Sequence, residues 1–480
     1  MRNTILFSTL GFALALPVAA LERGEVTLEP CRLDASGTPR RVEAFCARTE
    51  VPEDHAAPDG RKIELRFAVL PAVRRDPQPD PLLLLAGGPG QASTEAFLGT
   101  VRTLERVRRE RDLVMIDQRG TGRLSLLRCD EGSESSFDVD ADALEDLMQA
   151  CLEQVEDVTD PKAYTTTASV LDMDLIRQRL GYETVNLYGI SYGSRLAQAY
   201  ARQFPEHVRA IVVDGIAPLD LNLAVSFGDD TQRALDALFA RCEADETCRE
   251  TLPDLASRLN EFLAGLEEQP QAMSVSHPRT GEPVDFEFTR EFAGQALRLL
   301  LYSPETAALI PVLVDRAAAG HVSRLAAQWM MVAESLGSSI NTPMSLSVNC
   351  AEDAAFYDPA ALDAAATAGF LRDDVPRHLQ RACRVWPHKE VPAEEKLPLT
   401  SDLPTLILSG ENDPVTPPYL GEQLLATMSN ARHLVVPGMG HGVLERGCMP
   451  KLVTEFLAEP DPAGLDATCI EKVEPLPIFL

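Results

Sequence analysis

One pentapeptide constrains the fold more than any other feature of this chain. Gly189-Ile190-Ser191-Tyr192-Gly193 follows an apolar run at residues 185–188 and opens a helix-forming stretch at residues 194–203. A G-x-S-x-G sequence between a strand and a helix is typical of a sharp turn that leaves no space for flanking side chains and lifts the serine hydroxyl above the sheet. The alternative, a glycine-rich turn with an inert serine, accounts for the composition but not for this placement. The pattern therefore predicts strand, turn and helix over residues 185–203.

Short apolar runs recur along the chain, and their length suits β-strands. They lie at residues 82–85, 113–116, 185–188, 210–213, 406–408 and 434–436. Runs this short and continuous are typical of parallel strands that are covered on both faces. Residues 62–70 instead alternate polar and apolar side chains, as a half-buried strand at a sheet edge does. We therefore expect an α/β architecture with a doubly wound, mostly parallel sheet.

This strand pattern stops between about residues 217 and 404. Apolar residues there recur at helical spacing, at residues 233–241, 255–266, 290–301 and 307–320, which predicts a mostly helical insertion. A segment rich in proline and charge, residues 390–404, indicates the return to the sheet. The predicted organisation is a core in two parts, residues 21–216 and 404–480, with a helical cap domain at residues 217–403 between them.

The first twenty residues have the pattern of a signal peptide. Met1-Arg2-Asn3 precedes an apolar run at residues 5–18, which leads into the small residues Ala19 and Ala20. This run is shorter than the about 20 residues that a spanning helix needs, and no later stretch is long enough. We therefore predict cleavage after Ala20 and an exported protein, periplasmic or extracellular, without a membrane span.

Charge and cysteine content narrow the class of protein. The net charge is −29, from 44 basic and 73 acidic side chains, which would repel a nucleic-acid backbone. The ten cysteines are even in number and include no Cys-x-x-Cys pair, which favours disulfides over a zinc site. No metal or cofactor is expected. Small loop closures favour five local disulfides, although sequence alone does not fix connectivity: Cys31–Cys46, Cys129–Cys151, Cys242–Cys248, Cys350–Cys383 and Cys448–Cys469.

A serine hydroxyl needs a base to take its proton, and the base needs an orienting carboxylate. Asp413 follows the predicted strand at residues 406–408, and His441 lies in a glycine-rich loop after the predicted strand at residues 434–436. Both therefore lie at carboxyl ends of strands, where sites form in open α/β sheets. We predict Ser191 as nucleophile, His441 as general base and Asp413 as its orienting acid. The nearest rivals are His433 for the base, and Glu411 and Asp214 for the acid.

The oxyanion of such a reaction needs preorganised amide donors, each worth about 3 kcal/mol of the barrier. The backbone N–H of Tyr192 is one predicted donor. The other is predicted from Gly87-Gly88-Pro89-Gly90, directly after the strand at residues 82–85, with Gly88 preferred and Gly87 in reserve. A phosphate-binding role is disfavoured, because this loop has neither the lysine nor the spacing of nucleotide-binding loops.

These segments, together with Asp117-Gln118-Arg119-Gly120-Thr121-Gly122, resemble the proline iminopeptidase and tripeptidyl aminopeptidase branch of the α/β hydrolases over most of residues 60–450. The predicted signal peptide and cysteines such as Cys350 and Cys383 are more similar to the tripeptidyl aminopeptidases. The resemblance implies an α/β-hydrolase fold and a serine exopeptidase that removes amino acids or short peptides from a free N-terminus. Ala86 stands where proline iminopeptidases usually carry a histidine, which argues against strict proline specificity.

The resemblance also implies that acidic residues of the cap bind the substrate α-amino group. Glu352 and Asp353 are the predicted pair, and Asp117 and Arg119 are predicted to brace the loop beneath the oxyanion donors. Two other functions fit the sequence less well. An esterase or lipase-like hydrolase shares the fold, and a non-catalytic binding protein on this scaffold would typically lose a catalytic residue.

Overall fold

The computed structural model describes residues 19–35, 40–129 and 141–480, so the predicted signal peptide lies almost entirely outside the described part. The described strands form a ten-stranded sheet and a separate two-stranded sheet. The strands are β1 (Leu21–Arg23), β2 (Val26–Asp34), β3 (Arg41–Pro52), β4 (Lys62–Leu70), β5 (Leu82–Leu85), β6 (Leu113–Ile116), β7 (Val185–Ile190), β8 (Val208–Asp214), β9 (Gln271–Ser276), β10 (Pro283–Phe288), β11 (Thr405–Gly410) and β12 (Ala431–Val436).

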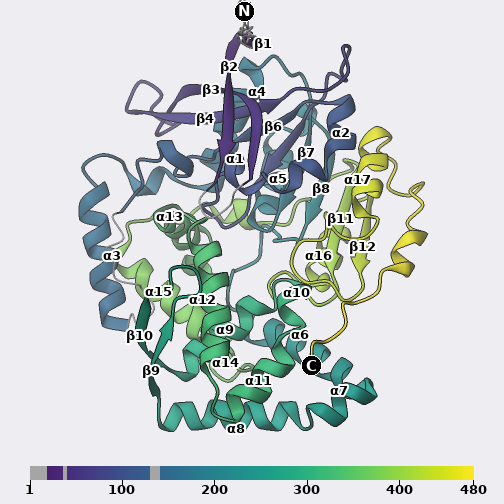
Figure 1. Cartoon of the computed structure of the whole chain (residues 1–480). Helices are drawn as coiled ribbons and strands as arrows, with labels where there is room; N and C mark the ends of the chain where they lie inside the picture. Colours follow the sequence, from purple (N-terminus) through teal and green to yellow (C-terminus); the bar gives the residue numbers. More distant parts are fainter. Residues whose placement is uncertain (1–18, 36–39, 130–140) are drawn as a thin grey trace, which may run out of the picture.

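The large sheet (Figure 1) has a parallel part and an antiparallel part. Strands β6, β5, β7, β8, β11 and β12 are parallel neighbours in that order. Strands β1 to β4 continue the sheet as antiparallel neighbours, and β4 pairs with β6. The predicted strands are all confirmed, but β1, β2 and β3 were not predicted. Mixed polar and apolar side chains and Pro30 within β2 weaken the strand pattern there.

Helices cover both faces of this sheet, which explains its continuous apolar strands. On one face, Leu83, Leu187 and Ile211 pack with side chains of helices α4 (Thr166–Arg179), α5 (Tyr192–Gln203) and α16 (Pro418–Leu425). The opposite face packs against α2 (Glu105–Glu110) and α17 (Met449–Ala458). The predicted α/β-hydrolase architecture with a doubly wound sheet is therefore confirmed. Two further helices precede the insertion: α1 (Ser93–Ala96) follows β5, and α3 (Ala141–Val155) follows β6.

The long insertion enters after β8 and returns before β11, and most of its helices lie below the large sheet in the view of Figure 1. Its helices are α6 (Phe227–Ala244), α7 (Glu246–Thr251), α8 (Leu255–Glu268), α9 (Arg290–Leu300), α10 (Pro304–Ala307), α11 (Ile310–Ala318), α12 (Ser323–Gly337), α13 (Thr342–Glu352), α14 (Pro359–Ala365) and α15 (Asp374–Val385). It also contains the antiparallel hairpin β9–β10, which was not predicted.

Two apolar clusters divide this insertion. Side chains of α6, α8, α9, α11 and α12 form a cluster of their own, closed by the hairpin. In contrast, Met344 and Val348 of α13 and Ala382 of α15 join the cluster on the sheet. Helix α13 and Ala382 of α15 therefore pack with the core, whereas Phe370 and Leu371 join the first cluster. The predicted boundaries at residues 217 and 403 stay a prediction.

Five disulfides join cysteines that are neighbours along the chain. No cysteine is free, and the pairs are those that the order of the cysteines suggested: Cys31–Cys46, Cys129–Cys151, Cys242–Cys248, Cys350–Cys383 and Cys448–Cys469. Within the described ranges, no helix is both long and apolar enough to cross a membrane.

Candidate active site

The turn between β7 and α5 holds Ser191 in a backbone conformation that side-chain-bearing residues rarely adopt. Its φ is 56° and its ψ is −127°, and α5 begins at the next residue. A Cβ atom at Gly189 would lie 2.1 Å from the Gly193 carbonyl oxygen, and one at Gly193 would lie 2.0 Å from the Leu85 oxygen. Only glycine fits at positions 189 and 193. The close contact of Gly193 with β5 helps to hold Ser191 in its strained backbone conformation.

The loop after β11 buries Asp413 completely and surrounds its carboxylate with donors. The backbone N–H groups of Val415 and Thr416 donate to Oδ1 over 2.8 Å each, and the Thr416 hydroxyl donates to Oδ2 over 2.9 Å. Oδ2 also lies 2.8 Å from Nδ1 of His441. Because an ionised carboxylate only accepts hydrogen bonds, Nδ1 of His441 carries the proton in this pair. Its Nε2 is then the free base.

Burial and charge act in opposite directions on this pair. Burial raises the pKa of Asp413, but the positive charge and hydrogen bond of His441 outweigh it, so the net shift is downward. Burial lowers the pKa of His441, but the charge and hydrogen bond of Asp413 outweigh it, so the net shift is upward. An ionised Asp413 with a histidine of raised basicity is the arrangement that general-base catalysis requires.

Thr416 is part of this arrangement but was not predicted. Its Oγ1 lies 3.1 Å from Nδ1 of His441 as well as 2.9 Å from Asp413. A hydroxyl residue three positions after a loop aspartate commonly closes a local turn. That spacing is the signal in the sequence that could have identified it.

Asp214, the rival acid, has a different place in the structure. Its carboxylate accepts hydrogen bonds from the N–H groups of Val443 and Leu444, with a shortest distance of 2.8 Å to each. It also accepts one from the Tyr188 hydroxyl over 3.0 Å. Its carbonyl oxygen accepts the N–H of Ser191 at 2.9 Å. Asp214 therefore joins the serine turn to the loop that carries the histidine, although its side chain does not bond the imidazole.

The other two rivals are occupied elsewhere. Glu411 accepts the N–H of Gly438 at 2.8 Å. His433 lies in β12 with Nδ1 2.6 Å from Glu422 and Nε2 2.9 Å from Ser409. Both residues fasten the sheet and its loops, so their contacts are those of structural residues.

Ser191 and Tyr192 line a cavity of about 410 Å³ together with Gly88, one of the predicted oxyanion donors. A Cβ atom at Gly87 would lie 3.0 Å from Cβ of Ser191, so the backbone of this loop runs directly beside the serine. A larger cleft of about 920 Å³ on strands β2 to β4 contains none of these residues. The smaller cavity is the one that the chemistry of the serine turn can use.

Two residues that contact His441 also line this cavity. Its backbone N–H donates to the Tyr302 carbonyl over 2.8 Å, and its ring packs edge-on against the Tyr302 ring with centroids 5.4 Å apart. Tyr302 and Thr416 both line the cavity with Ser191. Among the described residues no hydrogen bond joins the Ser191 hydroxyl to the imidazole; such contacts are often long before substrate binds and tighten in the reacting complex.

Asp117 and Arg119 lie in the loop after β6 and are both buried. Asp117 accepts the N–H and the hydroxyl of Thr94 at 2.9 Å each, and burial raises its pKa to about 6. Arg119 forms a bidentate pair with Asp172 over 2.8 and 2.7 Å. These contacts fit the predicted role of bracing the loop.

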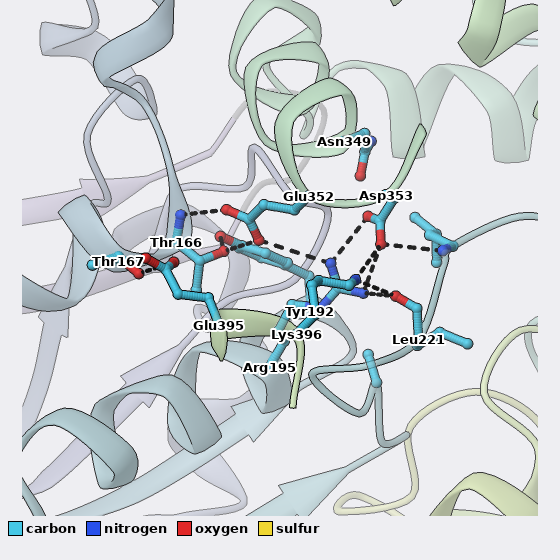
Figure 2. Close-up of polar contacts among 12 residues, drawn as sticks. Thr166, Thr167, Tyr192, Arg195, Leu221, Asn349, Glu352, Asp353, Glu395 and Lys396 are labelled. Carbon is cyan, nitrogen blue, oxygen red and sulfur yellow. Dashed lines mark hydrogen bonds and ion pairs between the residues drawn. The ribbon is translucent and has the colours of Figure 1, made fainter. Parts of the chain in front are cut away.

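Glu352 and Asp353, the predicted amino-group ligands, end helix α13 in a buried polar cluster (Figure 2). Arg195 of α5 donates two hydrogen bonds to Asp353, both over 3.0 Å. Glu352 accepts the N–H and hydroxyl of Thr166 at 2.7 and 2.6 Å. The Lys396 ammonium lies 3.4 Å from Asp353.

Both carboxylates are thus engaged by the protein itself, and neither lines the Ser191 cavity. The cluster ties the end of α13 to the helix that begins after the serine. Binding of a substrate amino group by Glu352 and Asp353 stays a prediction, and the contacts described here do not favour it.

In the part of the chain that the structure describes, no cluster of histidine, cysteine and acidic side chains has the arrangement of a metal site.

Comparison with known proteins places this geometry in a family. A family model described as alpha/beta hydrolase fold matches residues 80–447. Serine protease Hip1 of Mycobacterium tuberculosis is 26% identical over 469 residues, covering 89% of this chain and 88% of the relative. Tripeptidyl aminopeptidase of Streptomyces coelicolor is 27% identical over 221 residues, covering 42% of this chain and 40% of the relative. The solved structure of a proline iminopeptidase from Mycobacterium smegmatis covers 86% of this chain and 99% of its own, with 16% identity and a TM-score of 0.39. The resemblance seen in the sequence is confirmed, and the chain belongs to the alpha/beta hydrolase fold family.

Proposed function

We propose that this protein is an exported serine exopeptidase that removes single residues or short peptides from a free N-terminus. The observation that carries the proposal is the combination of a strained serine turn with a buried Asp413–His441 pair, fastened to each other through Asp214. This is the arrangement that serine hydrolases use to activate a hydroxyl.

In the proposed reaction, Ser191 Oγ attacks the scissile carbonyl while Nε2 of His441 takes the hydroxyl proton. The carbonyl oxygen becomes an oxyanion, which the N–H groups of Tyr192 and Gly88 are proposed to stabilise. His441 then gives the proton to the leaving amine, and the C–N bond breaks to leave an acyl-enzyme. Water, activated by the same imidazole, attacks this ester and regenerates Ser191 with release of the acid.

Two further observations support a short peptide substrate. The cavity of about 410 Å³ beneath the insertion falls in the range of small-ligand sites, about 300–1,000 Å³. The relatives described above include a protease and a tripeptidyl aminopeptidase.

The five disulfides, together with the signal-peptide pattern of residues 1–20, support export into an oxidising compartment.

The exopeptidase proposal is tested by blocking the substrate amino group. We expect aminoacyl and tripeptidyl 4-nitroanilides with a free N-terminus to be cleaved at least about tenfold faster than their N-acetylated forms, which is the effect of losing a single charged contact. Release of 4-nitroaniline measures both rates. Equal rates would exclude recognition of a free N-terminus while leaving the hydrolase chemistry in place.

The raised pKa of His441 predicts the acid limb of activity. The imidazole must be neutral to act as base, so kcat/KM should rise as pH rises through the pKa of His441 in the folded protein. Because that pKa is raised, the midpoint should lie above 6.5, the ordinary value for histidine. A pH profile of kcat/KM between about 5 and 9 measures it.

Asp117 supplies the control for this profile, because its pKa of about 6 lies close to the same range. Asp117→Asn keeps a group that can contact Thr94 and should leave the midpoint in place. A midpoint below 6.5, or one that moves with Asp117→Asn, would assign the limb to another group.

A further inference from the structure

The charge of the Ser191 cavity is opposite to the charge of the protein. The chain carries 73 acidic and 44 basic side chains, yet no aspartate or glutamate is among the described residues that line this cavity. Its ionisable basic side chains are Arg195, Arg298 and His378. Whether these side chains can attract an anionic group depends on which of them lack a carboxylate partner.

Two of these three side chains already have a carboxylate partner. Asp353 accepts two hydrogen bonds from Arg195. Nδ1 of His378 lies 3.2 Å from a carboxylate oxygen of Glu291. These charges are compensated within the protein, which leaves Arg298 as the cation to explain.

Arg298 has no carboxylate within ion-pair distance in the described ranges of the chain. Its guanidinium lies over the rings of Phe227, at 4.6 Å, and Tyr302, at 5.5 Å, and one Nη donates to the Tyr302 hydroxyl over 3.0 Å. Its Nε is buried without a hydrogen-bond partner. Two aromatic faces thus hold the guanidinium in place, and the Tyr302 hydroxyl is the one described protein group that accepts a hydrogen bond from it.

The position of Arg298 places that acceptor near the reaction. Arg298 lies in the last turn of α9, and Tyr302, four residues later, contacts the backbone and ring of His441. Arg298 and Ser191 both line the cavity. A group bound by Arg298 would belong to the molecule whose bond Ser191 attacks.

We propose that Arg298 binds a carboxylate of the substrate, so that the enzyme prefers substrates with an anionic group near the scissile bond. The planar guanidinium matches a carboxylate better than it matches a neutral acceptor, and the pair is strong when water is partly excluded. The proposal rests on the proposed Ser191 chemistry. The carboxylate has two possible sources, an acidic side chain or the free C-terminus of a short peptide.

Paired substrates that differ only in this charge provide the test. The first pair is the mono-4-nitrophenyl ester of adipic acid and its methyl ester, which probes the cavity whether or not the enzyme is a peptidase. The second pair is Glu- and Gln-4-nitroanilide, and the third is Ala-Ala-Ala and its C-terminal amide. The second and third pairs distinguish a side-chain carboxylate from a terminal one.

We expect the wild-type protein to favour the carboxylate member of the ester pair, and of at least one peptide pair, by about 10- to 100-fold in kcat/KM. In Arg298→Gln this ratio should fall to near one, mainly through KM, whereas Arg298→Lys should keep part of it. Arg316→Gln removes an exposed arginine of α11 and should leave the ratio unchanged.

The ratio of kcat/KM between the two members of each pair is measured first on the wild-type protein, so this part of the test does not depend on whether a variant folds. A ratio of one or less in all three pairs would overturn the proposal, and so would an equal loss for both members of each pair in Arg298→Gln, which is the result of a purely structural role. Cleavage of the esters without cleavage of any peptide would contradict the exopeptidase function. In that case the ratio of kcat/KM between the two esters still decides whether Arg298 binds a carboxylate.

Discussion

Replacement of Ser191 with alanine is expected to lower turnover of amino-terminal anilides by about 10⁶-fold, the size of effect seen when a serine nucleophile is removed. The reason is that Ser191 is the group proposed to form the acyl-enzyme. The protein should stay folded, because the Ser191 hydroxyl makes no hydrogen bond among the described residues and the backbone of the turn is held by Asp214 and α5. Turnover and thermal unfolding measured on the same preparation separate the two effects.

A matched control is Ser257→Ala, which removes an exposed hydroxyl from α8 in the insertion. It should keep wild-type turnover. A fluorophosphonate probe should label the wild type and Ser257→Ala but not Ser191→Ala. Unchanged turnover in Ser191→Ala, or labelling that persists there, would remove the serine from the mechanism and favour a different nucleophile.

Asp413→Asn is expected to lower kcat by about 10⁴-fold, as loss of the orienting carboxylate does in other serine hydrolases. The asparagine can still accept the N–H groups of Val415 and Thr416, so the loop keeps its shape. However, its amide has half the acceptor capacity and no charge, so it no longer holds the proton on Nδ1 of His441. The imidazole then loses both the required tautomer and the raised basicity.

Glu411→Gln serves as the control for this substitution, because Glu411 is the alternative acid in the same loop and the one hydrogen bond of its side chain among the described residues is from the N–H of Gly438. Its kcat should stay within a few-fold of the wild type. The opposite pattern, with loss in Glu411→Gln and little loss in Asp413→Asn, would reassign the acid. Circular dichroism of both variants checks that the loop substitutions leave the fold intact.

The sequence predicted the parts of this molecule that local patterns determine. Continuous apolar runs identified β5, β6, β7, β8, β11 and β12, because strands covered on both faces need apolar side chains at every position. The serine turn was predicted because its two glycines answer a local steric demand, as the contacts at Gly189 and Gly193 show. Strands β2 and β3 and the hairpin β9–β10 were missed, because their partly exposed faces carry mixed side chains.

Contacts between distant segments were not predictable in the same way. The bonds of Asp214 to Val443 and Leu444 join residues more than two hundred positions apart. Asp353 pairs with Arg195, which lies 158 positions away, so a carboxylate that looked available in the sequence already has a partner. Arg298, which has no carboxylate partner among the described residues, could be recognised as a candidate only once the lining of the cavity was known.

The long insertion begins after β8 and ends before β11, yet these two strands are direct parallel neighbours in the sheet. The separation between the serine and the histidine is therefore set by strand pairing and by the Asp214 bridge, whatever the length of the segment between them. One contact from the insertion also reaches the histidine, because the Tyr302 carbonyl accepts the N–H of His441. Changes in length elsewhere in the insertion that keep Tyr302 in place are therefore expected to leave this separation unaltered.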